Sequence, residues 1–500
     1  MPWFQAKFLT MLAAWASAAA YAQWPAIDNE NLAARLSSTT KIYLPGSNGF
    51  NASGERWSYL EAPKVNIVVV PATENDVVQT VKFAALFNLP FLAFNGVHGA
   101  ITTLGRMDYG IEIDLSQLSS VQIAPDGMTA KIGGGTLSKT ITDTLWPAGK
   151  ETVTGTCECV SYLGPALGGG HGWLQGHYGL ASDQLVSANI VLADGTLRTV
   201  DAQSDLWWAI RGAGHNFGIV TSVTSKIYPR TQTSWALKMF IFTGDRLEAL
   251  YQATNDHLLK NGTQPVSVIN YSYWVNIPAI DPNAPVMVFY IIQEGTTAVS
   301  PTFTSPFDAL GPVSTDSLSG TYRDLAAWTG SALDSPVCVK GAGLANPRFP
   351  IYLKTYNTTA QRLVYNLYAS AVSSPGSPFS DSSFLWEGYS TQGVKSIDSA
   401  SSAYAFRGVN DLLIAPTITY TVTDAARDAQ ARVLGNQLRE LLRQGSGSAA
   451  QRAPAYVNYA YGDEGPKGWY GEEEWRQARL RGLKRKYDRD GRFSFYAPIL

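Results

Sequence analysis

The stretch Pro90-Phe91-Leu92-Ala93-Phe94-Asn95-Gly96-Val97-His98-Gly99-Ala100 decides the fold of this chain. An apolar run typical of a strand passes directly into a loop of small residues that ends at a histidine. Glycine has no Cβ and tolerates positive φ, so the N–H groups of such a loop can approach an anion such as a phosphate. His98 would then reach past the phosphate toward the rest of the ligand. Taken alone, the loop also fits an ordinary turn with a surface histidine.

The residues before and after this loop predict an open α/β arrangement. Strands are expected at 66–71 and 89–94, with a helix at 76–87 between them. This β-α-β unit delivers the loop at the end of a strand, where open α/β sheets bind ligands. Further strands are predicted at 110–115 and 129–132, and the second of these ends in three consecutive glycines, at 133–135.

The segment 155–179 is unusually rich in glycine. Such a density cannot form an ordinary helix or strand, because each glycine loses backbone entropy without packing a side chain. We interpret the segment as backbone wrapped around a large flat ligand. A helix at 204–211 then leads into the glycine loop 212–218 and another strand, an order opposite to that of the dinucleotide fingerprint, so a classical Rossmann unit is excluded.

The second half of the chain differs from the first in glycine content and in its predicted helices and strands. From about 231 to 450 it has fewer glycine clusters, with strands such as 285–293 and helices such as 247–259 and 425–443. A linker at 444–448 ends this part, and the last fifty residues are rich in aromatic side chains. A chain of 500 residues is too long for one core, so two or three domains are expected.

The N-terminal residues, the glycosylation sequons and the net charge predict where the protein is found and which partners it lacks. Residues 1–22 resemble a signal peptide with the cleavage site Ala20-Tyr21-Ala22, and sequons begin at Asn51, Asn261, Asn270 and Asn357. We therefore expect a secreted glycoprotein. The net charge of -2 and the absence of a basic stripe argue against nucleic acid as a partner, and no stretch is long enough to suggest a membrane span.

The three cysteines, Cys157, Cys159 and Cys338, are too few for a disulfide scaffold. Cys157 and Cys159 are too close in sequence for an easy bridge with each other. Either could pair with Cys338, or a thiol could have another task.

Five motifs in this order resemble the berberine bridge enzyme-like family of the vanillyl-alcohol oxidase superfamily, in its fungal secreted form. They are Val70-Pro71 with Asp76-Val77, the loop at 95–99, Gly155-Thr156-Cys157 with the following glycines, 205–209 leading to Gly218-Ile219-Val220, and Tyr456-Val457-Asn458-Tyr459. The resemblance implies an α+β protein. It would have a two-part FAD-binding domain of the PCMH type at 60–230 and a substrate domain at 231–450. A segment at 451–500 would return to complete the flavin site.

The resemblance also implies covalently bound FAD. His98 matches the histidine that bonds the flavin 8α-methyl group, and Cys157 matches the cysteine that bonds C6 in bicovalent members, with Cys159 as the competing candidate. Phe94 and Val97 depart from the usual arginine and glycine, which puts the phosphate contacts in question but leaves the histidine in place. The other residues expected at the cofactor are Asn95, Gly96, Val97, Gly99, Gly133, Gly134, Val160, Gly164, Gly168, Gly169, Gly172, Ile219, Val220, Asn458 and Tyr459.

For catalysis, Tyr456 matches the base of carbohydrate-oxidising members, and Glu387 falls near their supporting acid. A phenol needs a neighbour that lowers its pKa to act as a base at neutral pH; alternatively, Tyr456 only packs beneath the flavin. Ser396 stands where the alkaloid ring-closing members have glutamate, which argues against that ring closure. Val160 matches a valine that admits oxygen. His171, His177 and His215 lack a metal-ligand pattern, so no metal is expected.

We therefore expect a secreted FAD oxidase, active as a monomer, with a small-molecule substrate and O2 as its partners. It would transfer hydride from an alcohol-type carbon of a secondary metabolite or sugar to FAD, and O2 would reoxidise the flavin to give H2O2. One alternative is oxidative cyclisation or dehydrogenation at carbon. A second, from another class, is a secreted flavin-fold protein that has lost catalysis.

Overall fold

The computed structural model describes residues 29–96, 98–260, 262–408, 412–447 and 453–500. The predicted signal peptide, Val97, Asn261 and the end of the predicted linker lie outside these residues. None of the helices in the described ranges is both long and apolar enough to cross a membrane.

The first sheet carries the loop at 95–99. It is built from β1 (Lys41–Tyr43), β2 (Val65–Val70), β3 (Phe91–Phe94) and β4 (Gly110–Asp114), in the order β1-β2-β4-β3. Strands β2, β4 and β3 are parallel, and α4 (Glu74–Leu86) connects β2 to β3. Helix α4 begins with a capping box between Thr73 and Asp76. The sequence predicts this β-α-β unit, but β4 lies between the two predicted strands.

The second sheet is antiparallel. Its strands are β5 (Val121–Ile123), β6 (Thr129–Gly133), β8 (Leu185–Val191), β9 (Leu197–Asp201) and β10 (Ile219–Lys226), in the order β5-β6-β10-β8-β9. The glycine-rich segment at 155–179 lies between two of these strands, β6 and β8. The helix predicted at 204–211 appears as α9 (Leu206–Ala213), and α5 (Ser138–Leu145) follows β6. Between β7 (Lys150–Glu151) and β8 the glycine-rich segment forms turns and three short helices, α6 (Leu163–Leu167), α7 (Gln175–Tyr178) and α8 (Ala181–Gln184).

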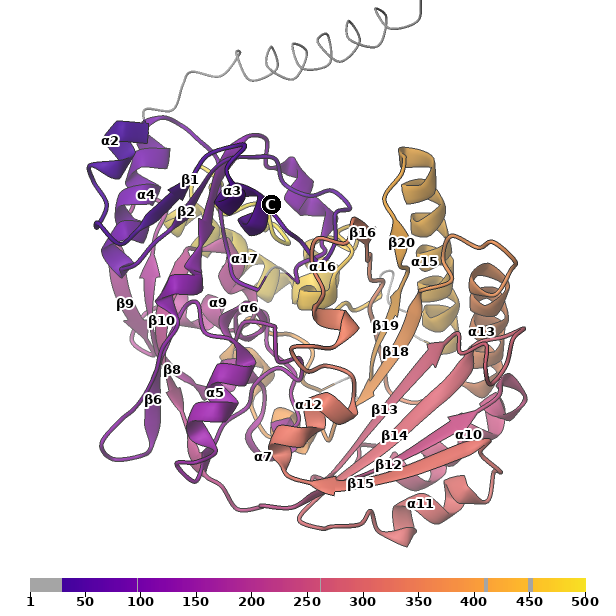
Figure 1. Ribbon diagram of the computed structural model, residues 1–500. Helices are drawn as coiled ribbons and strands as arrows, with labels where there is room; N and C mark the ends of the chain where they lie inside the picture. The colour runs from indigo at the N-terminus through magenta and orange to yellow at the C-terminus, as the bar shows by residue number, and fades with distance from the viewer. Residues whose placement is uncertain (1–28, 97, 261, 409–411, 448–452) are drawn as a thin grey trace, which may run out of the picture.

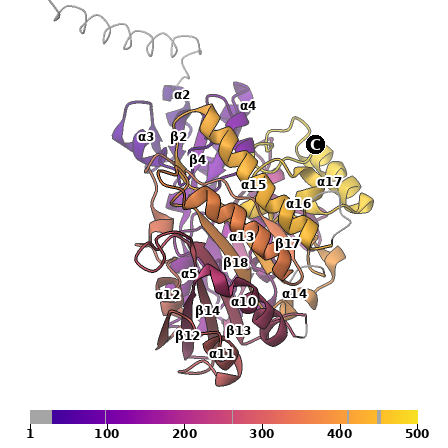
Figure 2. The ribbon, with the colours of Figure 1, turned by 90° about the vertical axis from the view of Figure 1, so that its right-hand side faces the viewer.

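The third sheet has seven antiparallel strands in the order β15-β12-β14-β13-β18-β19-β17. They span β12 (Trp235–Phe242), β13 (Val268–Val275), β14 (Val286–Glu294), β15 (Ser314–Gly320), β17 (Ile351–Leu353), β18 (Ser383–Gly388) and β19 (Leu412–Thr417). Helices α10 (Leu247–Ala253), α11 (Pro301–Asp308), α13 (Thr358–Val372) and α15 (Ala425–Gly445) cover its outer face, as Figure 2 shows.

Alternation along β13 and β18 determines which side chains reach the inner face of this sheet. Successive side chains of a strand point to opposite faces. Trp274 and Trp386 pack into the core beneath the helices, whereas Tyr271 and Glu387, which are paired across the two strands, point to the other face and line a cavity. The inner face is therefore polar and aromatic at the point where it meets the first two sheets.

The C-terminal segment returns to the first half of the chain. Helices α16 (Gly465–Tyr470) and α17 (Glu474–Tyr487), yellow in Figure 1, lie beside the elements that precede β10. Leu480 and Leu483 of α17 share a core with Leu206 and Ile210 of α9. The ammonium group of Lys484 donates a 2.9 Å hydrogen bond to the carbonyl of Asn216. The C-terminal segment, which also carries Tyr456, is thereby held against α9 and the loop that precedes β10.

Candidate active site

A cavity of about 780 Å³ lies where the three sheets and the C-terminal segment meet. The loop after β3, the glycine-rich segment, the inner face of β13 and β18, and the residues around Tyr456 all line it. Among the residues predicted from the sequence, the wall contains Asn95, His98, Gly99, Gly134, Cys157, Val160, Gly164, Ile219, Val220, Glu387, Tyr456, Asn458 and Tyr459. The structure therefore brings together most of the predicted site from widely separated parts of the chain.

His98 is held in the cavity wall by an indole ring and an arginine. Its imidazole stacks on Trp57 with ring centroids 5.3 Å apart, and the Arg348 guanidinium donates a 2.9 Å hydrogen bond to the His98 carbonyl. Burial, with a smaller effect of the Arg348 charge, lowers the pKa of His98 to about 3. The imidazole is therefore neutral at physiological pH, with a ring nitrogen available as a nucleophile.

The three cysteines lie together beside His98. Cys159 forms a disulfide with Cys338, and Cys157 is free. The Cys157 sulfur lies 3.4 Å from the Cys159 sulfur and 3.7 Å from the Cys338 sulfur. Of the pairings left open by the sequence, the structure shows the one between Cys159 and Cys338, so the thiol on the cavity wall is that of Cys157. Burial raises the pKa of this thiol to about 11.

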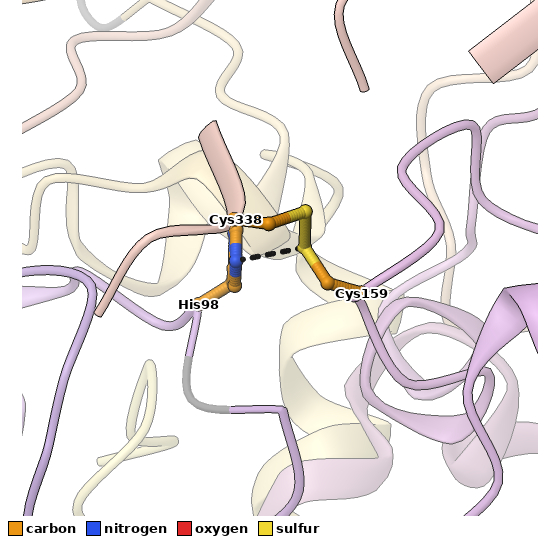
Figure 3. A group of neighbouring side chains, drawn as sticks. All are labelled: His98, Cys159 and Cys338. Atoms are coloured by element: carbon orange, nitrogen blue, oxygen red, sulfur yellow. Dashed lines mark hydrogen bonds between the residues drawn. A yellow bond between two sulfur atoms is a disulfide. The ribbon is translucent and has the colours of Figure 1, made fainter. Parts of the chain in front are cut away.

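His98 Nε2 also approaches the disulfide, at 3.3 Å from the Cys159 sulfur (Figure 3). One ligand atom from each of His98, Cys159 and Cys338 lies within 4.8 Å of the others, a separation that would suit a metal ion. Cysteine binds metals as a thiolate, however, and both cysteines are oxidised here. In this state the cluster cannot act as a three-ligand metal site.

Several of the predicted glycines lie behind the cavity wall rather than on it. A Cβ on Gly133 or Gly172 would approach a backbone carbonyl oxygen, of Leu118 or Thr154, to 1.9 Å. The remaining predicted glycines outside the wall are Gly96, Gly168 and Gly169. Gly96 and Gly169 have positive φ, and a Cβ on Gly168 would meet the Asn458 amide oxygen at 2.2 Å. These glycines thus allow other parts of the protein to pack closely.

The hydroxyl oxygen of Tyr456 accepts two N–H groups. The backbone N–H of His171 donates to it over 3.2 Å and the Asn458 amide over 2.7 Å. Pro165 fixes the orientation of that amide, because its carbonyl accepts a second hydrogen bond, 2.9 Å long, from the same nitrogen. Both donors favour a negative charge on the phenol oxygen. Burial acts in the opposite direction and is larger, so the pKa of Tyr456 is raised to about 12.

Glu387 is buried among tyrosines on the inner face of β18. The hydroxyl groups of Tyr389 and Tyr459 donate to its Oε1 over 3.1 and 3.4 Å, and the hydroxyl of Tyr271 contacts that of Tyr389. Its Oε2 has no hydrogen-bond partner. Burial raises the pKa of Glu387 to about 7, against the opposing effect of the tyrosine hydrogen bonds. This carboxyl group can therefore take up or release a proton near neutral pH.

The histidines of the glycine-rich part have separate roles. His171 contacts the Tyr352 hydroxyl over 2.7 Å and the Gln175 amide oxygen over 2.8 Å, so it belongs to a hydrogen-bonded network beside Tyr456. His177 contacts Glu294 away from the cavity wall. His215 lines the cavity; its Nε2 lies 3.0 Å from the Gly164 carbonyl oxygen, and its buried Nδ1 has no partner.

These features fit a large planar cofactor. The wall includes glycines at positions 99, 134, 155, 164 and 218, where no side chain occupies the space. Polar atoms without partners face the same region: Nδ1 of His215, Nε of Arg348 and Oε2 of Glu387. A neutral imidazole, His98, and a free thiol, Cys157, both lie on this wall. The cavity therefore offers both covalent and hydrogen-bonding groups to a flavin.

Comparison with known proteins agrees with this assignment. The FAD binding domain family model matches residues 65–201. The chain is 55% identical to the FAD-linked oxidoreductase chyH of Penicillium rubens over 98% of this chain and 99% of that protein. The chain belongs to the FAD-linked oxidoreductases.

Solved structures show the same fold at low identity. BBE-like 1 of Physcomitrella patens gives a TM-score of 0.78 at 19% identity, covering 94% of this chain and 99% of that chain. The glucooligosaccharide oxidase of Acremonium strictum, described with a 6-S-cysteinyl, 8α-N1-histidyl FAD, gives 0.78 at 17% identity, covering 95% and 99%. This FAD-linked oxidoreductase thus has the PCMH-type fold that its sequence motifs predict.

Sequence reasoning missed part of the site. Trp57 lies before the first motif, and Arg348 lies in an irregular segment between two prolines, so neither belongs to a periodic pattern. Tyr271 and Tyr389 reach Glu387 only through strand pairing and the end of β18. The alternation Phe384-Leu385-Trp386-Glu387 is the one signal that could have placed the carboxyl group opposite the tryptophan core.

Proposed function

We propose that this FAD-linked oxidoreductase is a secreted oxidase that removes a hydride from an alcohol-type carbon of a small molecule, a secondary metabolite or a sugar. When bound, the FAD accepts the hydride and is reoxidised by O2 to give H2O2. The observation that carries the proposal is the Tyr456 hydroxyl, which accepts two N–H donors and lines the same cavity as His98 and Glu387.

Tyr456 serves as the proton acceptor in this proposal. Because its oxygen already accepts the N–H groups of His171 and Asn458, its own proton must be directed elsewhere, and the cavity lies beside it. Loss of that proton leaves a phenolate held by the same two donors. The phenol must first lose its own proton, against the burial that raises its pKa to about 12. The two donors stabilise the resulting phenolate, which then accepts the proton of the substrate hydroxyl.

Glu387 would act as a second proton-holding group. Its pKa of about 7 allows it to hold a proton at mildly acid pH and release it above neutrality. Tyr459 bridges the two groups: its hydroxyl donates to Glu387 over 3.4 Å, and its ring lies 5.0 Å from that of Tyr456. Glu387 can thus hold or release a proton within hydrogen-bonding distance of Tyr389 and Tyr459, on the same wall as Tyr456.

We further propose that His98 and Cys157 attach the cofactor. Support comes from the neutral imidazole of His98 and from the disulfide between Cys159 and Cys338, which leaves Cys157 as the free thiol on the wall. The described linkage in the Acremonium strictum oxidase uses the same two residue types. A tether of this kind would prevent loss of the cofactor from a protein outside the cell.

Oxygen reactivity, secretion, N-glycosylation and a monomeric state are part of the same proposal. Val160 lines the cavity together with Cys157, and its side chain is small, which supports access of O2.

The predicted leader at 1–22 and the exposed sequon asparagines Asn51 and Asn357 support secretion and N-glycosylation. Asn270 does not: it is buried in β13, and its side-chain amide donates to the Tyr290 carbonyl over 2.8 Å. Asn357 caps α13, with its side-chain oxygen accepting the Ala360 N–H over 3.1 Å.

The test is anaerobic reduction of the purified holoprotein by a panel of alcohols, sugars and aromatic metabolites, followed by exposure to air. An oxidase bleaches with its substrate under anaerobic conditions and yields one H2O2 for each product when O2 is admitted. Substrates that become cyclised or desaturated at carbon instead would support the alternative reaction. A protein purified without bound flavin would contradict the proposal.

A further inference from the structure

Arg348 is a cation of the cavity wall that has no acidic partner. Among the described residues no carboxylate lies within 4.0 Å of its guanidinium, and its Nε has no hydrogen-bond partner. Its one side-chain hydrogen bond runs from Nη2 to the His98 carbonyl over 2.9 Å. The guanidinium lies over the rings of Trp57, at 4.8 Å, and Tyr459, at 4.5 Å.

This arrangement is costly unless a ligand completes it. A buried charge without a counterion is strongly disfavoured, and burial lowers the pKa of Arg348. The acid that acts on it electrostatically is Glu387, which makes no ion pair with it and whose own burial favours the neutral form. Two aromatic rings hold the planar fork in place, so most of its N–H groups remain available to a ligand.

The geometry of an arginine fork indicates what that ligand group is. Guanidinium N–H groups match the two oxygens of a carboxylate in a bidentate pair, and the match is weaker for a neutral hydroxyl or amide. Apolar side chains also line the cavity. Val337 and Val339 line it although their side chains are 37% and 55% exposed. Tyr273 and Val275 of β13 also line the cavity. An acid with an apolar or aromatic body satisfies both parts of the wall.

We propose that Arg348 binds the carboxylate of the substrate, so that the oxidoreductase acts on an apolar or aromatic monocarboxylic acid. This inference rests on the proposed function, because it assigns the substrate class of the same cavity. The competing source of negative charge is the cofactor itself, whose anionic groups could also pair with the guanidinium. The experiment is designed to separate these two sources.

The probes are benzoate and benzamide, which have the same ring and nearly the same shape and differ in charge. Isothermal titration calorimetry on the holoprotein gives their dissociation constants without any turnover. The variants are Arg348→Met, which removes the charge, and Arg348→Lys, which keeps the charge but loses the fork. Lys340→Met is the matched control, because Lys340 is an exposed cation on the neighbouring segment that does not line the cavity.

We expect the wild type to bind benzoate more tightly than benzamide. Loss of one partner of a buried charge pair should weaken benzoate binding by at least about 30-fold in Arg348→Met, with a smaller loss in Arg348→Lys and none in Lys340→Met. Benzamide binding should not change. The flavin content per protein, measured after denaturation, should match that of the wild type in all variants.

Equal affinity for benzoate and benzamide, or an unchanged benzoate constant in Arg348→Met, would overturn the inference. So would loss of flavin from Arg348→Met with retention in Lys340→Met, because the guanidinium would then pair with the cofactor. Benzoate binding through Arg348 in a protein that no substrate reduces would contradict the proposed oxidase reaction and leave the carboxylate site intact. If Arg348→Met does not fold, Arg348→Lys decides by the same comparison.

Discussion

The buried carboxyl group of Glu387 makes stability depend on pH in a way that a single substitution can reveal. Burial raises its pKa from 4.5 to about 7. In the folded state the carboxyl group therefore stays protonated over a range in which the unfolded chain has lost the proton. The resulting stabilisation is fully present below pH 4.5 and is lost as the pH rises through 7. At about 1.4 kcal/mol per pKa unit, it amounts to about 3 kcal/mol.

Glu387→Gln removes this titration and keeps an oxygen that can accept from Tyr389 and Tyr459. Between pH 5 and pH 8.5 the wild type should lose about 2.5 kcal/mol of unfolding free energy relative to the variant. Urea unfolding followed by tryptophan fluorescence at several pH values gives the difference between the two curves. Asp381→Asn, at an exposed carboxyl group on the cavity rim, is the control and should run parallel to the wild type. A constant difference between wild type and Glu387→Gln across this range would refute the reasoning.

Three further predictions concern the cofactor and the proton acceptor. Asn458→Ala should slow anaerobic flavin reduction by about tenfold and shift the rise of the rate with pH to higher pH, because one charge-stabilising hydrogen bond to Tyr456 is worth about 1.5 kcal/mol; an unchanged pH profile, measured by stopped flow, would exclude this role. Cys157→Ser should leave one covalent link, so that acid precipitation keeps the flavin on the protein, whereas adding His98→Ala should release it into the supernatant; release from the single variant would contradict a link through His98. Gly168→Ala should lower Tm and reproduce the kinetic effect of Asn458→Ala, since the added methyl group would meet the Asn458 amide oxygen at 2.2 Å; normal kinetics in a folded variant would show that Asn458 does not move.

The first half of the fold could be predicted because its signals are local. The apolar run before Asn95, the helix predicted at 76–87 and observed as α4 (Glu74–Leu86), and the glycines at 133–135 each follow from neighbouring residues. The insertion of β4 between β2 and β3 could not be predicted, because strand order depends on pairing between distant segments. The domain boundaries of the sequence analysis remain predictions.

The site was predictable where chemistry is tied to a motif. His98, Cys157 and Tyr456 could be predicted because each stands in a recognisable local pattern, and all three line the cavity. Gly133 and Gly172 show the limit of such reasoning: glycine indicates a close approach, but the partner here is a protein carbonyl group rather than a ligand. Partners brought together only by tertiary packing, such as Arg348 with Trp57, leave no trace in the sequence.

The group of three sulfurs has a consequence for making the protein. Cys338 is bonded to Cys159, yet the sulfur of Cys157 is only 3.7 Å away. Oxidation during biosynthesis therefore has two products of nearly equal reach, and only one of them spares the thiol that would hold the second edge of the flavin. Under the proposed attachment through His98 and Cys157, preparations oxidised without an isomerase would contain a singly tethered subpopulation, whose spectrum and redox behaviour would differ from those of the correctly paired molecules.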